Sequence, residues 1–116
     1  MIDRNLDTRT KAHLVYLTPA ELARKLTAEP ACLVLDVRDP HELEGDLGAL
    51  PGAVNIPLKQ LEQRLGELSI QERKDIVVVC RTGKRSEAAA QMLQESGFEQ
   101  LFVLNGGMKA WRAEQR

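Results

Sequence analysis

The chain has 116 residues, of which 43% are hydrophobic, 28% charged and 3% aromatic, and this length suffices for one domain with its own core. Sixteen Lys and Arg residues against seventeen Asp and Glu residues give a formal net charge of −1. This balance argues against binding of nucleic acid or an anionic membrane through the overall charge, so any anion-binding site must be local.

The first residues of the chain are polar. Residues 1–11 contain no apolar stretch that could serve as a secretory signal, and no later segment reaches the roughly 18 continuous apolar residues of a membrane helix. We therefore expect a cytoplasmic protein with a flexible polar tail over residues 1–12 and a single domain over residues 13–116.

The next segments predict a strand, a helix and a second strand. Residues 13–17 (HLVYL) suit a short strand. Thr18, Pro19 and Glu21 combine an N-cap hydroxyl, a proline at the first helical position and a capping acid, which predicts a helix that ends near residue 27. Residues 32–37 (CLVLDV) form an almost unbroken apolar run. Such a run is typical of a central parallel strand that is covered on both faces.

Shorter elements follow in the middle of the chain. Residues 39–42 (DPHE) repeat the cap, proline and acid pattern and predict a helical turn, followed by a loop over residues 45–52 and a brief strand over residues 53–56. A helix is expected from Pro57 onward. Its apolar stripe, which we expect to lie in the core, consists of Leu58, Leu61, Leu65 and Leu68.

The last third of the chain continues the alternation of strands and helices. Residues 76–79 (IVVV) are β-branched throughout and suit the centre of a sheet. A helix is expected from about Ser86 to Ser96, then a strand over residues 101–104 and a last helix through Trp111. This order predicts an α/β fold, with a parallel or mostly parallel sheet and helices on both faces. Ligands of such sheets bind at the carboxyl ends of the strands.

The loop that follows strand 76–79 carries the candidate chemistry. It reads Cys80-Arg81-Thr82-Gly83-Lys84-Arg85. Gly83 permits a sharp turn, so the backbone N–H groups can converge into an anion-binding nest. The three cations and the helix dipole favour a thiolate, which makes Cys80 the candidate nucleophile. The alternative is that Cys80 is a small buried hydrophobe at the end of a strand.

The other cysteine has no such neighbours. Cys32 is interpreted as structural, and neither cysteine has His or Cys residues at metal-ligand spacing. We therefore expect no metal and no organic cofactor. A thiolate in an anion-binding loop fits two reactions, which are transfer of a sulfane sulfur through a persulfide, and phosphoryl or arsenyl transfer.

Four segments of the chain resemble the rhodanese (sulfurtransferase) family. In order they are LVLDVRDPHE (33–42), PGAVNIP (51–57), VVVCRTGKRS (77–86) and VLNGGMKAW (103–111). The resemblance spans residues 15–112 and implies a rhodanese-like fold, whose central parallel sheet has five strands flanked by helices. That count requires residues 13–17 to be a strand.

The resemblance also implies roles for the residues of the loop. Cys80 would form the persulfide, and the substrate-binding residues would be Arg81, Thr82, Gly83, Lys84 and Arg85. Lys84 and Arg85 would supply the side-chain contacts to the donor. The phosphatase-like branch of the family has its arginine six positions after the cysteine, whereas Arg85 follows Cys80 by five. This shorter loop favours sulfur over phosphate, and Asp39 and Glu42 stay open as general acids.

Several residues are interpreted as structural. Asp36 and Arg38 are expected to organise neighbouring loops through hydrogen bonds, and His41 is expected to be solvated. Met108 and Trp111 are expected to pack in the core. Where the family often reads Gly-His-Ile-Pro-Gly-Ala, the chain has a longer loop without histidine over residues 45–53, so we expect a local change of shape.

The leading hypothesis is a single-domain sulfurtransferase. It would move a sulfane sulfur from a small anionic, thiosulfate-like donor or a persulfide to cyanide, a thiol or a protein. The alternative is a sulfur-relay or interaction module without turnover, which receives sulfur from a partner enzyme. The third hypothesis is an oxyanion hydrolase or reductase. The loop length and the absence of a second cysteine near Cys80 in the sequence disfavour it. Nucleic acid and membranes are not expected partners.

Overall fold

The structure, a computed structural model, describes residues 14–71 and 74–115, with only the backbone over residues 69–71. The tail expected over residues 1–12 lies outside the described residues, as does His13. The five strands are β1 (Val15–Leu17), β2 (Leu33–Asp36), β3 (Val54–Asn55), β4 (Ile76–Val79) and β5 (Leu101–Leu104). They form one sheet in the order β1-β5-β4-β2-β3.

All neighbouring strands in the sheet are parallel. This confirms the predicted sheet and places the apolar β4 at its centre, between β5 and β2. Val15, Tyr16 and Leu17 pair with β5, so the short N-terminal strand on which the count of five depended is present. β1, β2 and β3 are shorter than the segments that predicted them, whereas β4 and β5 have the predicted bounds.

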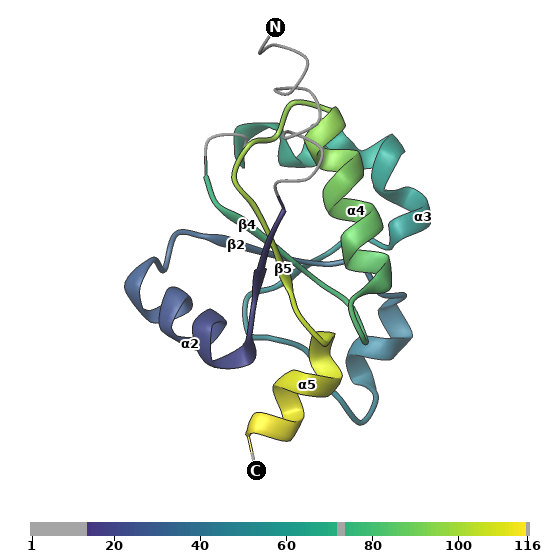
Figure 1. The fold of residues 1–116 in the computed structure, drawn as a ribbon. Helices are drawn as coiled ribbons and strands as arrows, with labels where there is room; N and C mark the ends of the chain where they lie inside the picture. Colours follow the sequence, from purple (N-terminus) through teal and green to yellow (C-terminus); the bar gives the residue numbers. More distant parts are fainter. Residues whose placement is uncertain (1–13, 72–73, 116) are drawn as a thin grey trace, which may run out of the picture.

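Helices cover both faces of the sheet (Figure 1). On one face lie α2 (Pro19–Ala28) and α5 (Gly107–Glu114), and on the other lie α3 (Leu58–Leu61) and α4 (Lys84–Glu95). The predicted cap of α2 is present, because the Thr18 hydroxyl accepts a hydrogen bond from the Glu21 N–H and the Glu21 carboxylate accepts one from the Thr18 N–H. The turn predicted over residues 39–42 is the 3₁₀ helix η1 (Pro40–Glu44).

The helix predicted from Pro57 differs from the expectation. Only Leu58–Leu61 is α-helical, and the chain continues as the 3₁₀ helix η2 (Glu62–Gln71). Two of the three leucine spacings are three residues, and this spacing suits both helix types, because residues three apart lie on one face of either. The apolar stripe nevertheless packs in the core, where Leu61 and Leu68 are buried and Leu58 and Leu65 are half-buried.

The start of α4 also differs from the expectation. The helix begins at Lys84, not near Ser86, and Gly83 is its N-cap in the left-handed conformation with φ +119°. Glycine adopts this conformation without steric cost, so the chain turns into the helix two residues early. Lys84 and Arg85 therefore belong to the first turn of α4 rather than to a loop.

Alternation along β4 divides the core into two layers. Ile76, Val78 and Cys80 face the layer that contains α3 and α4, whereas Val77 and Val79 face the layer of α2 and α5. Successive side chains of a strand point to opposite faces, so the position of Cys80 fixes which helix it meets. Met108 and Trp111 are buried in the second layer, as predicted.

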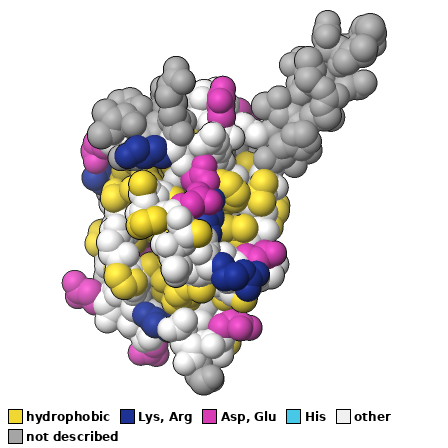
Figure 2. Space-filling view, turned by 90° about the vertical axis from the view of Figure 1, so that its left-hand side faces the viewer, with side chains coloured by type: hydrophobic (Ala, Val, Ile, Leu, Met, Phe, Trp, Pro, Cys, Tyr) yellow, Lys and Arg dark blue, Asp and Glu magenta, His cyan; other side chains and the backbone are white. Residues whose placement is uncertain are grey.

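The face that carries α2 shows charged side chains of both signs scattered among hydrophobic ones (Figure 2). This view agrees with the near-zero net charge of −1. Within the described ranges, every helix is too short or too polar to span a bilayer.

The N-terminus of α5 packs directly against the loop that begins at Cys80. The Met108 N–H donates to the Cys80 carbonyl at 2.8 Å, and the Lys109 N–H donates to the Arg81 carbonyl at 3.0 Å. Gly107 has φ +62°, and a Cβ there would lie 2.4 Å from the Arg81 carbonyl oxygen. Because backbone cannot yield easily, the position requires glycine.

We expect Gly107→Ala to lower the free energy of unfolding by about 2–4 kcal/mol, because it adds backbone overlap to left-handed strain. Gly52 is a matched control, since its φ is +78° and a Cβ there would meet nothing within 4 Å. Gly52→Ala should cost only about 1 kcal/mol, from the conformation alone. Urea unfolding followed by circular dichroism measures both variants, and equal losses would contradict the close approach of α5 to the loop.

Candidate active site

The site lies where the direction of the chain through the sheet changes. From β4 the chain passes to β5 on one side, and from β2 it passes to β3 on the other. The carboxyl ends of β2 and β4 therefore flank a topological switch point, where ligands of open α/β sheets bind. Cys80 directly follows β4, and Val37, Arg38 and Asp39 follow β2.

The sulfur of Cys80 faces the first turn of α4. The Gly83 N–H lies 3.0 Å from Sγ and the Ser86 N–H lies 3.3 Å from it, and both donate to the sulfur. The side chain is nearly inaccessible, at 1% exposure. Two N–H donors and the positive end of a helix stabilise negative charge on this sulfur. Of the loop N–H groups that the sequence predicted to converge, that of Gly83 points at the sulfur, and the second donor is Ser86, the residue after the predicted loop.

Ser86 is a site residue that the sequence analysis did not select. It is fully buried, and its hydroxyl donates to the Gly83 carbonyl at 2.9 Å and accepts a hydrogen bond from the Cys80 thiol at 3.4 Å. The Ser86 hydroxyl therefore links Cys80, at the start of the loop, to Gly83, at the start of α4. Its signal in the sequence is a small hydroxyl residue six positions after the cysteine, a position that the sequence analysis assigns only to the start of a helix.

The other predicted residues form the rim of the loop. Arg81, Thr82 and Lys84 are exposed, and Gly83 and Arg85 are half-buried. Arg85 makes a bidentate ion pair with Glu42 of η1, with Nη1 to Oε2 at 2.8 Å and Nη2 to Oε1 at 3.0 Å. This pair joins the two strand ends of the switch point, and it occupies part of the guanidinium that was expected to contact the donor.

The partnership with Arg85 also bears on Glu42 as a candidate general acid. Hydrogen bonding from Arg85 is the chief cause that lowers the pKa of Glu42 to about 2, with a further contribution from the Asp39 N–H. Glu42 is thus ionised at neutral pH and is not poised to donate a proton. In turn, the hydrogen bonds to Glu42 are the chief cause that raises the pKa of Arg85. Negative charge at Cys80 raises this pKa further.

Asp36 and Arg38 form a buried pair beneath the site. The Arg38 Nη2 lies 2.8 Å from the Asp36 carboxylate and also donates to the Gly48 carbonyl at 2.7 Å, while Nη1 donates to the Glu42 carbonyl at 3.3 Å. The pair therefore ties η1 to the loop over residues 45–52, which confirms the structural interpretation. A second arginine, Arg112, donates from Nε to the Leu47 carbonyl of the same loop at 2.7 Å.

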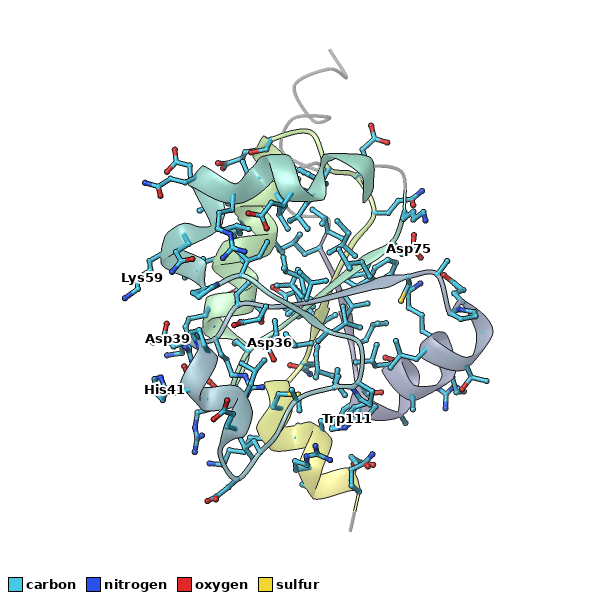
Figure 3. All side chains as sticks on the ribbon, turned by 180° about the vertical axis from the view of Figure 1, so that it is seen from behind. Asp36, Asp39, His41, Lys59, Asp75 and Trp111 are labelled. Carbon is cyan, nitrogen blue, oxygen red and sulfur yellow. The ribbon has the colours of Figure 1, made fainter. Side chains whose placement is uncertain are left out.

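Cys32 lies away from Cys80, because it precedes β2 and Cys80 follows the parallel neighbour β4. It lines a surface depression with Lys74 and Asp75, and burial is the chief cause that raises the pKa of its thiol. In Figure 3, Asp75 lies on the opposite side of the molecule from Asp39. Cys32 therefore does not share the site of Cys80.

Two further expectations from the sequence concern His41 and metal binding. His41 is exposed on η1, as expected. Across residues 14–71 and 74–115, no three His, Cys, Asp or Glu side chains gather in a way that could hold a metal ion.

Comparisons with known proteins bear on this arrangement. The family model described as "Rhodanese-like domain" matches residues 18–114. The chain is 44% identical over 78 residues to "Uncharacterized protein YqhL" of Bacillus subtilis, covering 67% of this chain and 59% of that protein, so the chain spans less than two thirds of this relative. It is 32% identical over 90 residues to a protein of Allochromatium vinosum named "Sulfurtransferase", covering 78% of this chain and 80% of the relative.

A solved structure agrees with the fold. The rhodanese-related protein of Thermoplasma volcanium superposes with a TM-score of 0.75 at 31% identity, covering 86% of this chain and 92% of that one. The match over residues 18–114 includes both strand ends of the switch point and the whole loop from Cys80 to Arg85. The chain belongs to the rhodanese family.

Proposed function

We propose that this chain is a sulfurtransferase whose Cys80 carries the transferred sulfur as a persulfide. Membership of the rhodanese family and the name of the Allochromatium vinosum relative support a role in sulfur transfer. The observation that carries the finer proposal is the pair of backbone N–H groups, from Gly83 and Ser86, that donate to the Cys80 sulfur.

The proposed reaction has two steps. The Cys80 thiolate attacks the outer sulfur of a donor such as thiosulfate, a new S–S bond forms, and sulfite leaves with the electron pair of the broken S–S bond. An acceptor such as cyanide or a thiolate then attacks the outer sulfur of the Cys80 persulfide, and the Cys80 thiolate leaves. The Gly83 and Ser86 N–H groups stabilise the thiolate that begins and ends this cycle.

The surroundings of Cys80 restrict the donor. Because Cys80 is only 1% exposed, a donor must present its sulfur on a slender terminus. The exposed cations Arg81 and Lys84 attract an anion to the rim, whereas Glu42 offsets the charge of Arg85. We propose Arg81, Thr82, Gly83, Lys84 and Arg85 as the substrate-binding loop, with Ser86 as a positioning residue.

The sulfur-relay module remains the second candidate. The burial of Cys80 within an exposed cationic rim favours it, since a protein donor could dock on the rim and deliver a sulfur inward. We do not propose a hydrolase or reductase, because Cys32 lies at the other edge of the sheet and Glu42 is held ionised by Arg85.

Incubation with thiosulfate should add the mass of one sulfur atom to the protein, and cyanide should remove it. Intact-protein mass spectrometry measures both changes. Cys80→Ala should show no gain, whereas Cys32→Ala, the matched control, should behave as the wild type. Circular dichroism checks that the Cys80→Ala chain is folded.

The outcomes separate the two candidates. A gain only from a protein donor, such as a cysteine desulfurase, would favour the relay module over turnover on small donors. A sulfur gain that persists in Cys80→Ala would refute the proposed role of Cys80.

Glu42→Gln should raise the rate of sulfur loading from thiosulfate, relative to an uncharged persulfide donor, by about three- to fivefold. The variant keeps hydrogen-bonding capacity but no longer offsets the charge of Arg85, and a partly exposed, solvent-screened charge pair is worth about 1 kcal/mol. Glu67→Gln, which breaks the remote surface pair with Arg64, is the control and should change neither rate. Stopped-flow loading rates with the two donors test this, and a selective fall for thiosulfate would contradict it.

The same ion pair predicts a pH dependence of stability. The pKa of Glu42 is lowered from its ordinary 4.5 to about 2 in the fold, so its contribution is complete above pH 4.5 and is lost as the pH falls toward 2. Both side chains are partly exposed, so we expect a solvent-screened contribution of about 1–2 kcal/mol. Urea unfolding should show wild type and Glu42→Gln diverging at pH 7 and converging near pH 2; a constant difference would contradict the assignment.

A further inference from the structure

Three polar or charged side chains are buried among the described residues, and they are Asp36, Arg38 and Ser86. The first two neutralise each other as an ion pair. Ser86 has no charge to neutralise, and it lies on the buried face of α4 with Ala89 and Ala90. An alanine in its place would favour the helix and would bury no hydroxyl. The packing of α4 therefore does not explain the serine.

A bond to the helix backbone does not explain it either. The Ser86 hydroxyl donates to the Gly83 carbonyl, three residues earlier, at 2.9 Å, and serines in helices often make such bonds. Ser96, the C-cap of α4, donates to the Met92 carbonyl at 3.0 Å in the same way and is exposed. The feature that distinguishes Ser86 is its second contact, because its Oγ lies 3.4 Å from the sulfur of Cys80.

The direction of this second contact depends on the charge of the sulfur. In the thiol form, Cys80 donates its S–H to the Ser86 Oγ. In the thiolate form, the sulfur has no hydrogen to donate and only accepts hydrogen bonds. The hydroxyl hydrogen of Ser86 can then rotate toward the sulfur without movement of any heavier atom, because a hydroxyl both donates and accepts.

The Gly83 carbonyl permits this rotation. It also accepts a hydrogen bond from the Glu87 N–H at 3.0 Å, so it keeps a partner when the Ser86 hydroxyl turns away. The hydroxyl thereby exchanges a bond to a neutral carbonyl for a bond to an anion, and hydrogen bonds to ionised groups are roughly twice as strong. Because Ser86 is fully buried, water does not compete for either bond.

We propose that the Ser86 hydroxyl is a third hydrogen-bond donor to the Cys80 sulfur, which acts only while that sulfur carries negative charge. It adds to the two backbone N–H donors, from Gly83 and Ser86. The inference rests on the proposed function and assigns a catalytic hydroxyl to the same site. This role goes beyond closure of the loop, because it changes with each step of the reaction.

The charge on Cys80 Sγ disappears and returns in the proposed cycle. During loading, the thiolate attacks the outer sulfur of thiosulfate, an S–S bond forms, and sulfite leaves with the electron pair of the broken bond. The negative charge passes from Sγ to the outer sulfur. During discharge, cyanide attacks the outer sulfur, thiocyanate forms, and Sγ recovers the electron pair as a thiolate. A donor to the charged Sγ therefore stabilises the reactant of loading and the leaving group of discharge.

Single-turnover kinetics of Ser86→Ala tests the inference. At about pH 9.5, above the ordinary range of a cysteine thiol, loading reports attack by a preformed thiolate. Loading from thiosulfate should become about threefold faster and discharge to cyanide about threefold slower, a combined tenfold effect that corresponds to exchange of a neutral hydrogen bond for a charged one. Ser96→Ala removes a hydroxyl with the same kind of carbonyl bond and should change neither rate.

Opposite changes in the two steps are the signature of a donor to the charged sulfur. Losses of similar size in loading and discharge would show that Ser86 only maintains the shape of the loop, and they would overturn the inference. Unchanged rates would overturn it as well. Circular dichroism checks that the Ser86→Ala chain is folded.

A measurement without sulfur transfer separates the inference from the proposed function. The ratio of thiolate to thiol at Cys80 can be followed at about pH 7 by the ultraviolet absorbance of the thiolate, with the matching Cys80→Ala protein as the blank. This ratio should be about tenfold lower in Ser86→Ala. The charged groups that act near Cys80 from α4 and η1, Arg85 and its partner Glu42, are unchanged in this variant.

The two measurements fail in different ways. An unchanged ratio of thiolate to thiol would overturn the inference even if Cys80 is loaded with sulfur. A lower ratio in Ser86→Ala, together with no loading of the wild type from thiosulfate or from a protein donor, would overturn the proposed function alone.

Discussion

The geometry of the site depends on how the chain turns from β4 into α4 around one sulfur atom. The turn requires Gly83 at φ +119°, and it directs the N–H groups of Gly83 and Ser86 at Cys80 Sγ. Since β4 is buried on both faces at the centre of the sheet, the start of this turn cannot move without disturbing the core. The sulfur therefore occupies a fixed position relative to its donors.

Two neighbouring structures brace this turn from opposite sides. Beneath it, the N-terminus of α5 donates two N–H groups to the Cys80 and Arg81 carbonyls, and the absence of a side chain at Gly107 allows this approach. Across the switch point, the buried Asp36–Arg38 pair holds the backbone of η1, and Glu42 of η1 holds Arg85 of α4. Each of these charged side chains has a partner of opposite charge. The buried Arg38 guanidinium is therefore not left as an unpaired cation.

This bracing has a consequence for specificity. An arginine at the mouth of an anion site would ordinarily select the most highly charged donor. Here Glu42 takes up two of the guanidinium N–H groups of Arg85. These contacts leave fewer N–H groups of Arg85 available to an anion.

Local sequence patterns predicted most of the elements and the candidate nucleophile, Cys80. The apolar run of β4, the capping residues of α2 and the glycine after Cys80 act over a few residues, so their structural consequences can be predicted without a fold. The extents of α3 and α4 were wrong, because a leucine spacing of three fits two helix types and because Gly83 begins α4 early.

The contacts that complete the site were decided only by the tertiary structure. Glu42 and Arg85 are 43 residues apart in the chain, and Gly107 meets a carbonyl of Arg81 from another element. Neither pairing leaves a periodic signal, because each depends on where the sheet order places two strand ends and one helix terminus. The sequence by itself predicted that the Cys80 sulfur lies at a turn whose backbone N–H groups can point toward it. The packing of separate elements around that turn decided which charged side chains remain available to a ligand.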